Sequence, residues 1–216
     1  MATAVSTAPI AFAYEKGDII VRAGVASVQP NEDSGNLDIG GVGKIPGTSA
    51  GVDGNEQLGL TLTWMLDSHW GIGVLAATPF EHDLVAHGLG PSIDAGSVKH
   101  LPPTVTLQYF PMDASSRFQP YAGLGINYTV FFDEDVDSQL ETTVGFSGDL
   151  ELDDSWGLAG QVGVDYAIDD HWLLNASIWY LDIETTADFK FADGTRIKAD
   201  VDVDPWVYML GLGYKF

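Results

Sequence analysis

Few residues of this 216-residue chain have the types and spacing that catalysis requires. Cysteine is absent, which excludes thiol nucleophiles, disulfides and thiolate metal sites. No serine shares a strand end and a face with any of the five histidines, which are His69, His82, His87, His100 and His171. The sequence therefore favours a protein that is not an enzyme and needs no cofactor. A hydrolase site assembled from loops at one rim stays an alternative.

Two groups of residues resemble metal ligands, but neither has the pattern of a metal site. His82, His87 and His100 surround one long connection without regular spacing. The acidic run at 133–137 lacks the EF-hand pattern, because Ser138 and Val144 replace its turn glycine and closing glutamate. We expect no metal, and a solvated acidic loop.

The charge balance excludes nucleic acid as a partner. The formal net charge is −22, from 31 acidic and 9 basic residues, whereas nucleic-acid binders carry basic surfaces. Acidic loops are compatible with lipopolysaccharide as a neighbour, through shared divalent cations.

Five polar residues fall inside stretches that otherwise alternate between apolar and small residues: Arg22, Gln108, Gln161, Asp165 and Lys215. Unpaired charges are costly inside a protein, so we expect these side chains to pair with one another. If the stretches form a small barrel, they would make a polar plug in its lumen. A continuous polar channel is the alternative, although eight strands enclose only enough room for side chains.

The alternation is clearest in the last stretch, 206–216, which reads WVYMLGLGYKF. Its even-numbered positions are large and apolar or aromatic, and the positions between are mostly small. A period of two predicts a strand. Aromatic residues at both ends of an aliphatic face are typical of a strand that crosses a bilayer.

Seven more stretches have the same design: 18–29, 57–65, 70–80, 101–110, 118–132, 156–168 and 172–183. The connections alternate between long (30–54, 81–98, 133–154, 185–202) and short (67–69, 111–117, 169–171). The sequence therefore predicts an all-β fold, an eight-stranded antiparallel transmembrane β-barrel with short periplasmic turns and long extracellular loops. A soluble barrel would place its bulky residues inward around a ligand, so we disfavour it.

Aromatic residues near the strand ends predict two girdles, one at each membrane interface. Beside the short turns stand Trp64, Trp70, Tyr109, Phe118, Tyr166, Trp172, Tyr214 and Phe216. Beside the long loops stand Phe80, Tyr128, Phe132, Trp156, Tyr180 and Trp206.

The first 13 residues carry no charge and end in Ala11-Phe12-Ala13, a small-x-small site typical of signal-peptide cleavage. We expect residues 1–13 to be a remnant of a signal peptide, and residues 14–216 to form a single barrel domain. A disordered N-terminal tail is the alternative.

The pair Pro102-Pro103 interrupts a predicted strand. Proline cannot donate a hydrogen bond to a sheet, so it stands at strand starts, edges and breaks. The pair marks either a lateral gap in the barrel wall or simply the start of the strand, and the residues alone favour neither.

Several motifs resemble the OmpW family of Gram-negative outer-membrane proteins, over nearly the whole chain from about residue 18 to 216. They are LAATPF (75–80), HLPPT (100–104), PYAGLGINYT (120–129), FFD (131–133), DSWGLAGQVGVDY (154–166) and DPWVYM (204–209). The resemblance implies an outer-membrane barrel with a narrow apolar gorge, constricted at Leu75 and Trp179. It also implies lateral release of cargo into the bilayer, which favours the gap at Pro102 and Pro103. Packing of a small lumen is the alternative role of Leu75 and Trp179.

The function that this resemblance implies is passive uptake of small hydrophobic molecules across the outer membrane, with small amino acids as alternative cargo. The expected partners are outer-membrane lipid, lipopolysaccharide and the hydrophobic substrates, and we expect a monomer. The competing class is a structural or interaction barrel whose loops bind host factors, phage or bacteriocins.

Overall fold

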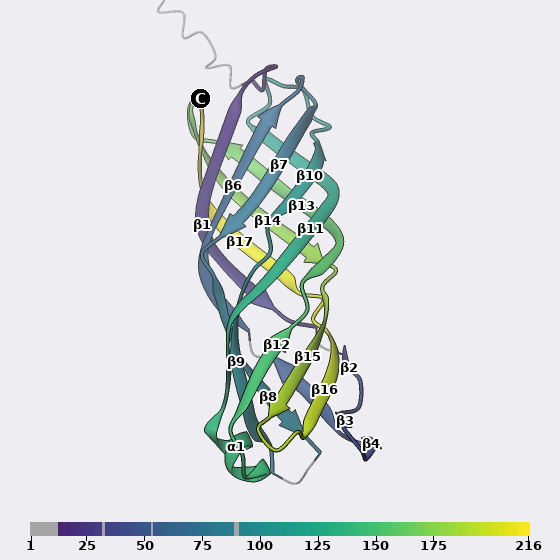
Figure 1. Ribbon diagram of the computed structural model, residues 1–216. Helices are drawn as coiled ribbons and strands as arrows, with labels where there is room; N and C mark the ends of the chain where they lie inside the picture. Colours follow the sequence, from purple (N-terminus) through teal and green to yellow (C-terminus); the bar gives the residue numbers. More distant parts are fainter. Residues whose placement is uncertain (1–12, 32, 53, 89–90) are drawn as a thin grey trace, which may run out of the picture.

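In the computed structural model, residues 13–31, 33–52, 54–88 and 91–216 are described. Apart from Ala13, the predicted signal-peptide remnant lies outside these residues. Within them, eight strands form the barrel: β1 (Ile19–Gln29), β6 (Asn55–Met65), β7 (Trp70–Ala77), β10 (Thr104–Tyr109), β11 (Phe118–Val136), β13 (Ser155–Ala167), β14 (Trp172–Leu181) and β17 (Trp206–Lys215). All neighbours are antiparallel, in the order β10-β7-β6-β1-β17-β14-β13-β11, and β11 closes the ring against β10 (Figure 1). The predicted eight-stranded barrel is confirmed.

The apolar faces of the strands point outward. Leu124 is 77% exposed and Leu210 is 69% exposed, in mid-strand positions where a soluble protein would place polar residues. Inward positions on the same strands are buried, as at Asn127 and Met209. This reversal suits a barrel whose outer surface contacts lipid. The described helix α1 (Ser138–Val144) is short, and none of the described helical segments has the length and apolarity to span a membrane.

Two aromatic girdles bound this outer surface, largely as predicted. On the side of the long connections, Tyr128 stacks on Trp156 with ring centroids 4.5 Å apart, and Tyr180 packs on Trp206 at 5.3 Å. Near the tight turns, similar contacts join Trp70 to Tyr109, and Tyr214 to Trp172 and Phe216.

The prediction that Phe80 belongs to a girdle is wrong, because its side chain is only 2% exposed. The predicted strand 70–80 is broken at Thr78-Pro79, so β7 ends at Ala77 and a new strand begins at Phe80. This break shifts the alternation by one residue and turns Phe80 inward.

The long connections are not loops but a second structured part beyond the barrel. A first group of three strands is paired to the outer half of β11, in the order β9, β8, β5. Its members are β5 (Ser49–Val52), β8 (Phe80–His87) and β9 (Ile93–Leu101). A second sheet contains β12 (Gly148–Leu152), β15 (Glu184–Phe191), β16 (Arg196–Asp202), β2 (Asp33–Ser34), β3 (Asp38–Ile39) and β4 (Gly43–Lys44). We call these strands together the extension; it occupies the end of the molecule opposite the C-terminus (Figure 1).

The extension folds because its strands also alternate. On β15 and β16, the apolar residues Ala187, Phe189, Ile197 and Val201 are buried, and charged residues such as Lys198 stand between them. These buried residues belong to the same apolar cluster as Leu75 and Trp179 in the barrel. The core therefore runs without interruption from the extension into the outer half of the lumen.

Three glycines allow the barrel to close at β1. Gly24 is paired with Gly59 on β6 and with Gly211 on β17. A Cβ atom added to Gly24 would lie 2.1 Å from the carbonyl oxygen of Leu210, closer than any real Cβ contact. The two strands can therefore approach only because this position has no side chain.

We expect Gly24→Val to weaken the closure of the barrel and to lower its free energy of unfolding by about 1–3 kcal/mol, the usual cost of overpacking. Guanidinium unfolding of the protein refolded in lipid measures the change. Gly160→Ala is the matched control, because its added Cβ meets only Leu124 Cδ2 at 3.9 Å. Equal stability of the two variants would contradict this account of the closure.

Candidate functional site: a floored lumen and an interrupted wall

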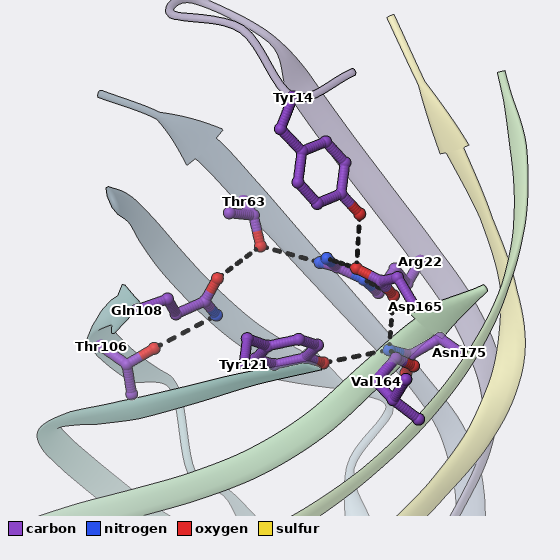
Figure 2. A network of polar contacts seen from close by, with 9 residues as sticks. All are labelled: Tyr14, Arg22, Thr63, Thr106, Gln108, Tyr121, Val164, Asp165 and Asn175. Atoms are coloured by element: carbon purple, nitrogen blue, oxygen red, sulfur yellow. Dashed lines mark hydrogen bonds and ion pairs between the residues drawn. The ribbon is translucent and has the colours of Figure 1, made fainter. Parts of the chain in front are cut away.

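The inner half of the barrel is filled by a polar network around Arg22 of β1 and Asp165 of β13 (Figure 2). Arg22 Nε donates to Asp165 Oδ1 at 2.9 Å, and a second guanidinium nitrogen bonds Oδ2. Both side chains are almost fully buried. A buried pair of this kind is tolerated only when further hydrogen bonds satisfy the remaining donors and acceptors.

Those further bonds come from three other strands, β14, β6 and β10, and from the segment before β1. Asp165 accepts from Tyr14 Oη at 2.7 Å and from Asn175 Nδ2 at 2.8 Å. Arg22 Nη1 donates to Thr63 Oγ1 at 2.8 Å, and Thr63 donates to Gln108 Oε1 at 2.9 Å. The network thus links side chains around the ring of strands (Figure 2).

The inward glycines make room for this network. A Cβ on Gly73 would lie 2.0 Å from Gln108 Nε2, and one on Gly123 would lie 2.7 Å from Gln161 Nε2. Gln161 Nε2 in turn donates to Thr106 Oγ1 at 3.1 Å. The space that glycine leaves in the lumen is thus taken up by long side chains from neighbouring strands.

Four of the five predicted polar residues face the lumen, but Lys215 lies elsewhere. Its Nζ donates to the carbonyl oxygen of Ala13 at 2.6 Å and lies 3.8 Å from Asp18 Oδ2, at the periplasmic rim. Lys215 pairs with Ile20 at the last position of the β1–β17 ladder. The alternation along a strand shows which face a side chain is on, but it does not show whether that side chain lies inside the lumen or at its rim.

Two residues of the lumen, Tyr14 and Tyr121, were not among those predicted from the sequence. Tyr14 packs edge-on against Phe110 with centroids 5.2 Å apart, and Phe110 lies 5.1 Å from Tyr121. With Ile20, Met65, Ala167 and Leu173 they form a small buried apolar cluster at the periplasmic end of the barrel. The inward parity of Tyr121 was a usable signal, whereas nothing in the sequence before β1 pointed Tyr14 into the lumen.

Leu75 and Trp179 both face inward, as predicted, and are 4% and 1% exposed. Both belong to the apolar cluster that continues into the extension. Trp179 Nε1 donates to Ser177 Oγ at 3.3 Å, which satisfies its polar atom inside the barrel. Above them, one cavity of about 30 Å³ lies between the two sheets of the extension.

The wall of the barrel is interrupted beside Leu75. Pairing between β7 and β10 ends at Leu75 and Thr104, and pairing between β8 and β9 begins at Phe80 and His100. Residues 76–79 and 101–103 separate these two ladders. Pro102 and Pro103 stand in this interval, where Thr104 Oγ1 and the Tyr128 amide bond their carbonyl oxygens at 2.9 and 3.1 Å.

Comparison with known proteins identifies relatives of this chain. A sequence model of the OmpW family matches residues 15–216. The chain is 49% identical to outer membrane protein W of Vibrio cholerae, over 99% of this chain and 94% of that protein. It is 48% identical to the Escherichia coli protein of that name, over 95% and 92%. The crystal structure of OprG from Pseudomonas aeruginosa superposes with a TM-score of 0.89 at 48% identity, covering 94% of this chain and 98% of that one.

We expect Asp165→Ala to destabilise the protein by about 3–5 kcal/mol, because Arg22 would remain buried without its counter-charge. Lys99→Ala is the control; its ion pair with Asp133 is exposed, and such pairs contribute about 0–1 kcal/mol. Unfolding in denaturant compares the two variants. An Asp165→Ala protein as stable as Lys99→Ala would show that the network does not hold the lumen together.

Proposed function

Because the chain belongs to the OmpW family of outer-membrane proteins, we propose that it admits small hydrophobic molecules passively across the outer membrane. The cargo enters the extension, moves along its apolar core and reaches Leu75 and Trp179. It then leaves sideways into the bilayer near Pro102 and Pro103. The mechanism needs no cofactor or energy source, because the cargo moves down its own gradient.

The observation that carries this proposal is the position of the wall interruption relative to the floor of the lumen. Leu75 is the last residue of β7 that pairs with β10, so the apolar core reaches the wall where the wall is broken. Beneath this level lie the Arg22–Asp165 network and the apolar cluster around Tyr14. Straight passage to the periplasm would have to displace both, whereas the sideways path meets lipid.

The hydrophobic nature of the cargo follows from the lining of the path. The buried residues between the extension and Trp179 are mostly apolar, with a few polar side chains such as Thr104, Asn127 and Ser155 among them. A small amino acid would therefore lose more hydrogen bonds to water than this lining could replace. A relative with 26% identity over 80% of this chain, from Pseudomonas aeruginosa, is described as a dibenzothiophene metabolism operon protein. Because dibenzothiophene is hydrophobic, that description agrees with the small hydrophobic cargo proposed for this chain.

In the structure the path is closed, since the cavity in the extension holds only about 30 Å³. That volume is far below the about 300–1,000 Å³ of a pocket that holds a small-molecule ligand. Passage therefore requires the side chains around Trp179 and the strands of the extension to move apart.

We expect Trp179→Ala to increase the uptake of a hydrophobic fluorescent probe into proteoliposomes several-fold, because the largest buried side chain of the path is removed. Trp172→Ala is the matched control, since Trp172 lies on the same strand but faces outward and is 47% exposed. Equal rates for Trp179→Ala and wild type would show that Trp179 does not limit passage.

We expect the double variant Pro102→Thr and Pro103→Val to slow the same uptake several-fold, because both residues regain an amide donor and can extend the ladder between β7 and β10. Pro120→Val is the control; Pro120 lies within β11, where it pairs with Val164. Uptake by wild type no faster than by empty liposomes would instead favour an interaction barrel with ligands at its outer surface.

A further inference from the structure

Two buried side-chain oxygens in the lumen have no hydrogen-bond partner among the described residues. They are the hydroxyl oxygen of Thr61 on β6 and the amide oxygen of Gln161 on β13. The two residues are only 6% and 4% exposed. A buried polar atom of this kind has given up its hydrogen bonds to water and gained none in return, so each one calls for an explanation.

Both oxygens belong to neighbours of the predicted constriction. Thr61 is paired with Leu75 on β7, and Gln161 is paired with Trp179 on β14. Directly opposed residues of neighbouring strands share a face of the sheet, and their Cβ atoms lie about 4.5–5.5 Å apart. Each residue of the constriction therefore has an unpartnered oxygen beside it.

The polar groups below this level are bonded to one another. Thr63, two residues nearer the periplasm than Thr61, accepts from Arg22 and donates to Gln108. Gln161 lies four residues nearer the extension than Asp165, on the same face of β13. Thr61 and Gln161 thus stand on the side of the Arg22–Asp165 network that faces the apolar path.

Two other buried oxygens that lack a partner lie away from this path. They are Gln119 Oε1 and Asn175 Oδ1, and both residues are paired with Asp165. They are therefore at the level of the buried ion pair, where a cargo that leaves through the wall does not arrive. Position, rather than the missing bond alone, distinguishes Thr61 and Gln161.

The side chains of Thr61 and Gln161 converge on one side of the lumen. Gln161 Nε2 reaches past β11 and donates to Thr106 Oγ1 on β10 at 3.1 Å. A Cβ atom on Gly73 of β7 would lie 2.8 Å from this same oxygen, so the Thr106 hydroxyl lies over β7. The next strand is β6, which carries Thr61.

The chemistry of the two oxygens suits a neutral hydroxyl group. The Gln161 amide oxygen needs a donor, whereas the Thr61 hydroxyl can both donate and accept. A cargo hydroxyl offers one donor and two lone pairs, so it can bond either oxygen. An ammonium group would be placed beside Arg22, which is paired with Thr61 on β1, and a carboxylate has no proton to donate to Gln161.

We propose that Thr61 and Gln161 bind the hydroxyl group of an amphipathic cargo, an alcohol or a phenol, whose apolar part lies along Leu75, Trp179 and the core of the extension. The contact forms when the side chains around Trp179 move apart, and it holds the cargo beside the wall interruption. This inference rests on the proposed path. It narrows the cargo from hydrophobic molecules in general to those with one hydrogen-bonding end.

Equilibrium photolabelling in nanodiscs tests this contact separately from uptake. The probe is a diazirine derivative of 1-octanol, and mass spectrometry maps the labelled residues. We expect label on β6 and β13 beside Thr61 and Gln161. With competitors matched by their content in the nanodisc, we expect 1-octanol to displace this label about two- to tenfold better than its isomer 1-methoxyheptane, which has no O–H to donate.

Variants assign the preference to the two oxygens. Thr61→Val keeps the shape of the side chain and removes a hydroxyl that makes no hydrogen bond within the described residues, so we expect the preference for 1-octanol to fall at least twofold. Adding Gln161→Met should abolish it. If the double variant does not fold, Thr61→Val alone carries the test. Thr186→Val is the control, because Thr186 donates to Asp200 on the outer face of β15 and should leave the preference unchanged.

Three results would overturn the hydroxyl site. They are equal competition by 1-octanol and 1-methoxyheptane in the wild type, a preference that Thr61→Val leaves unchanged, and label confined to lipid-facing residues. The transport proposal fails in a different way, because a preserved preference without any uptake would contradict the path and leave the site in place.

Discussion

The structure depends on the requirement that every backbone amide and carbonyl inside a bilayer finds a partner within the protein. A sheet meets this requirement only when it closes, and here the first and last barrel strands, β1 and β17, pair to complete the ring. The row of Gly59, Gly24 and Gly211 lets this closure form. Against this background an interruption of the ladder is informative, because it leaves backbone groups to be satisfied by other means.

The lumen is divided into two parts with different chemistry. On the periplasmic side, the Arg22–Asp165 pair and its hydrogen-bond partners fill the barrel, and the aromatic contacts of Tyr14 and Phe110 lie beneath them. On the outer side, the interior is mostly apolar and continuous with the extension. The interruption near Pro102 and Pro103 coincides with the boundary between these two parts. A barrel of eight strands is too narrow for an aqueous pore, which is why the proposed path leaves through the wall rather than through the floor.

The extension continues the apolar interior of the barrel outward. Its two sheets pack on each other through apolar side chains and enclose little free volume.

The eight strands, their faces and, Phe80 apart, the two girdles were predictable from the residues alone. A period of two in side-chain character is a local property, which lipid outside and a packed lumen inside both enforce. The inward direction of Arg22, Gln108, Gln161 and Asp165 was predictable for the same reason, since alternation along a strand fixes the face of each side chain. Features that depend on distant partners appeared only in the folded arrangement. The break at Thr78-Pro79 shifted the alternation and buried Phe80, the long connections paired with one another as strands, and Tyr14 entered the lumen. Pairing between segments far apart in the chain is set by how the whole sheet closes, and no local pattern records it.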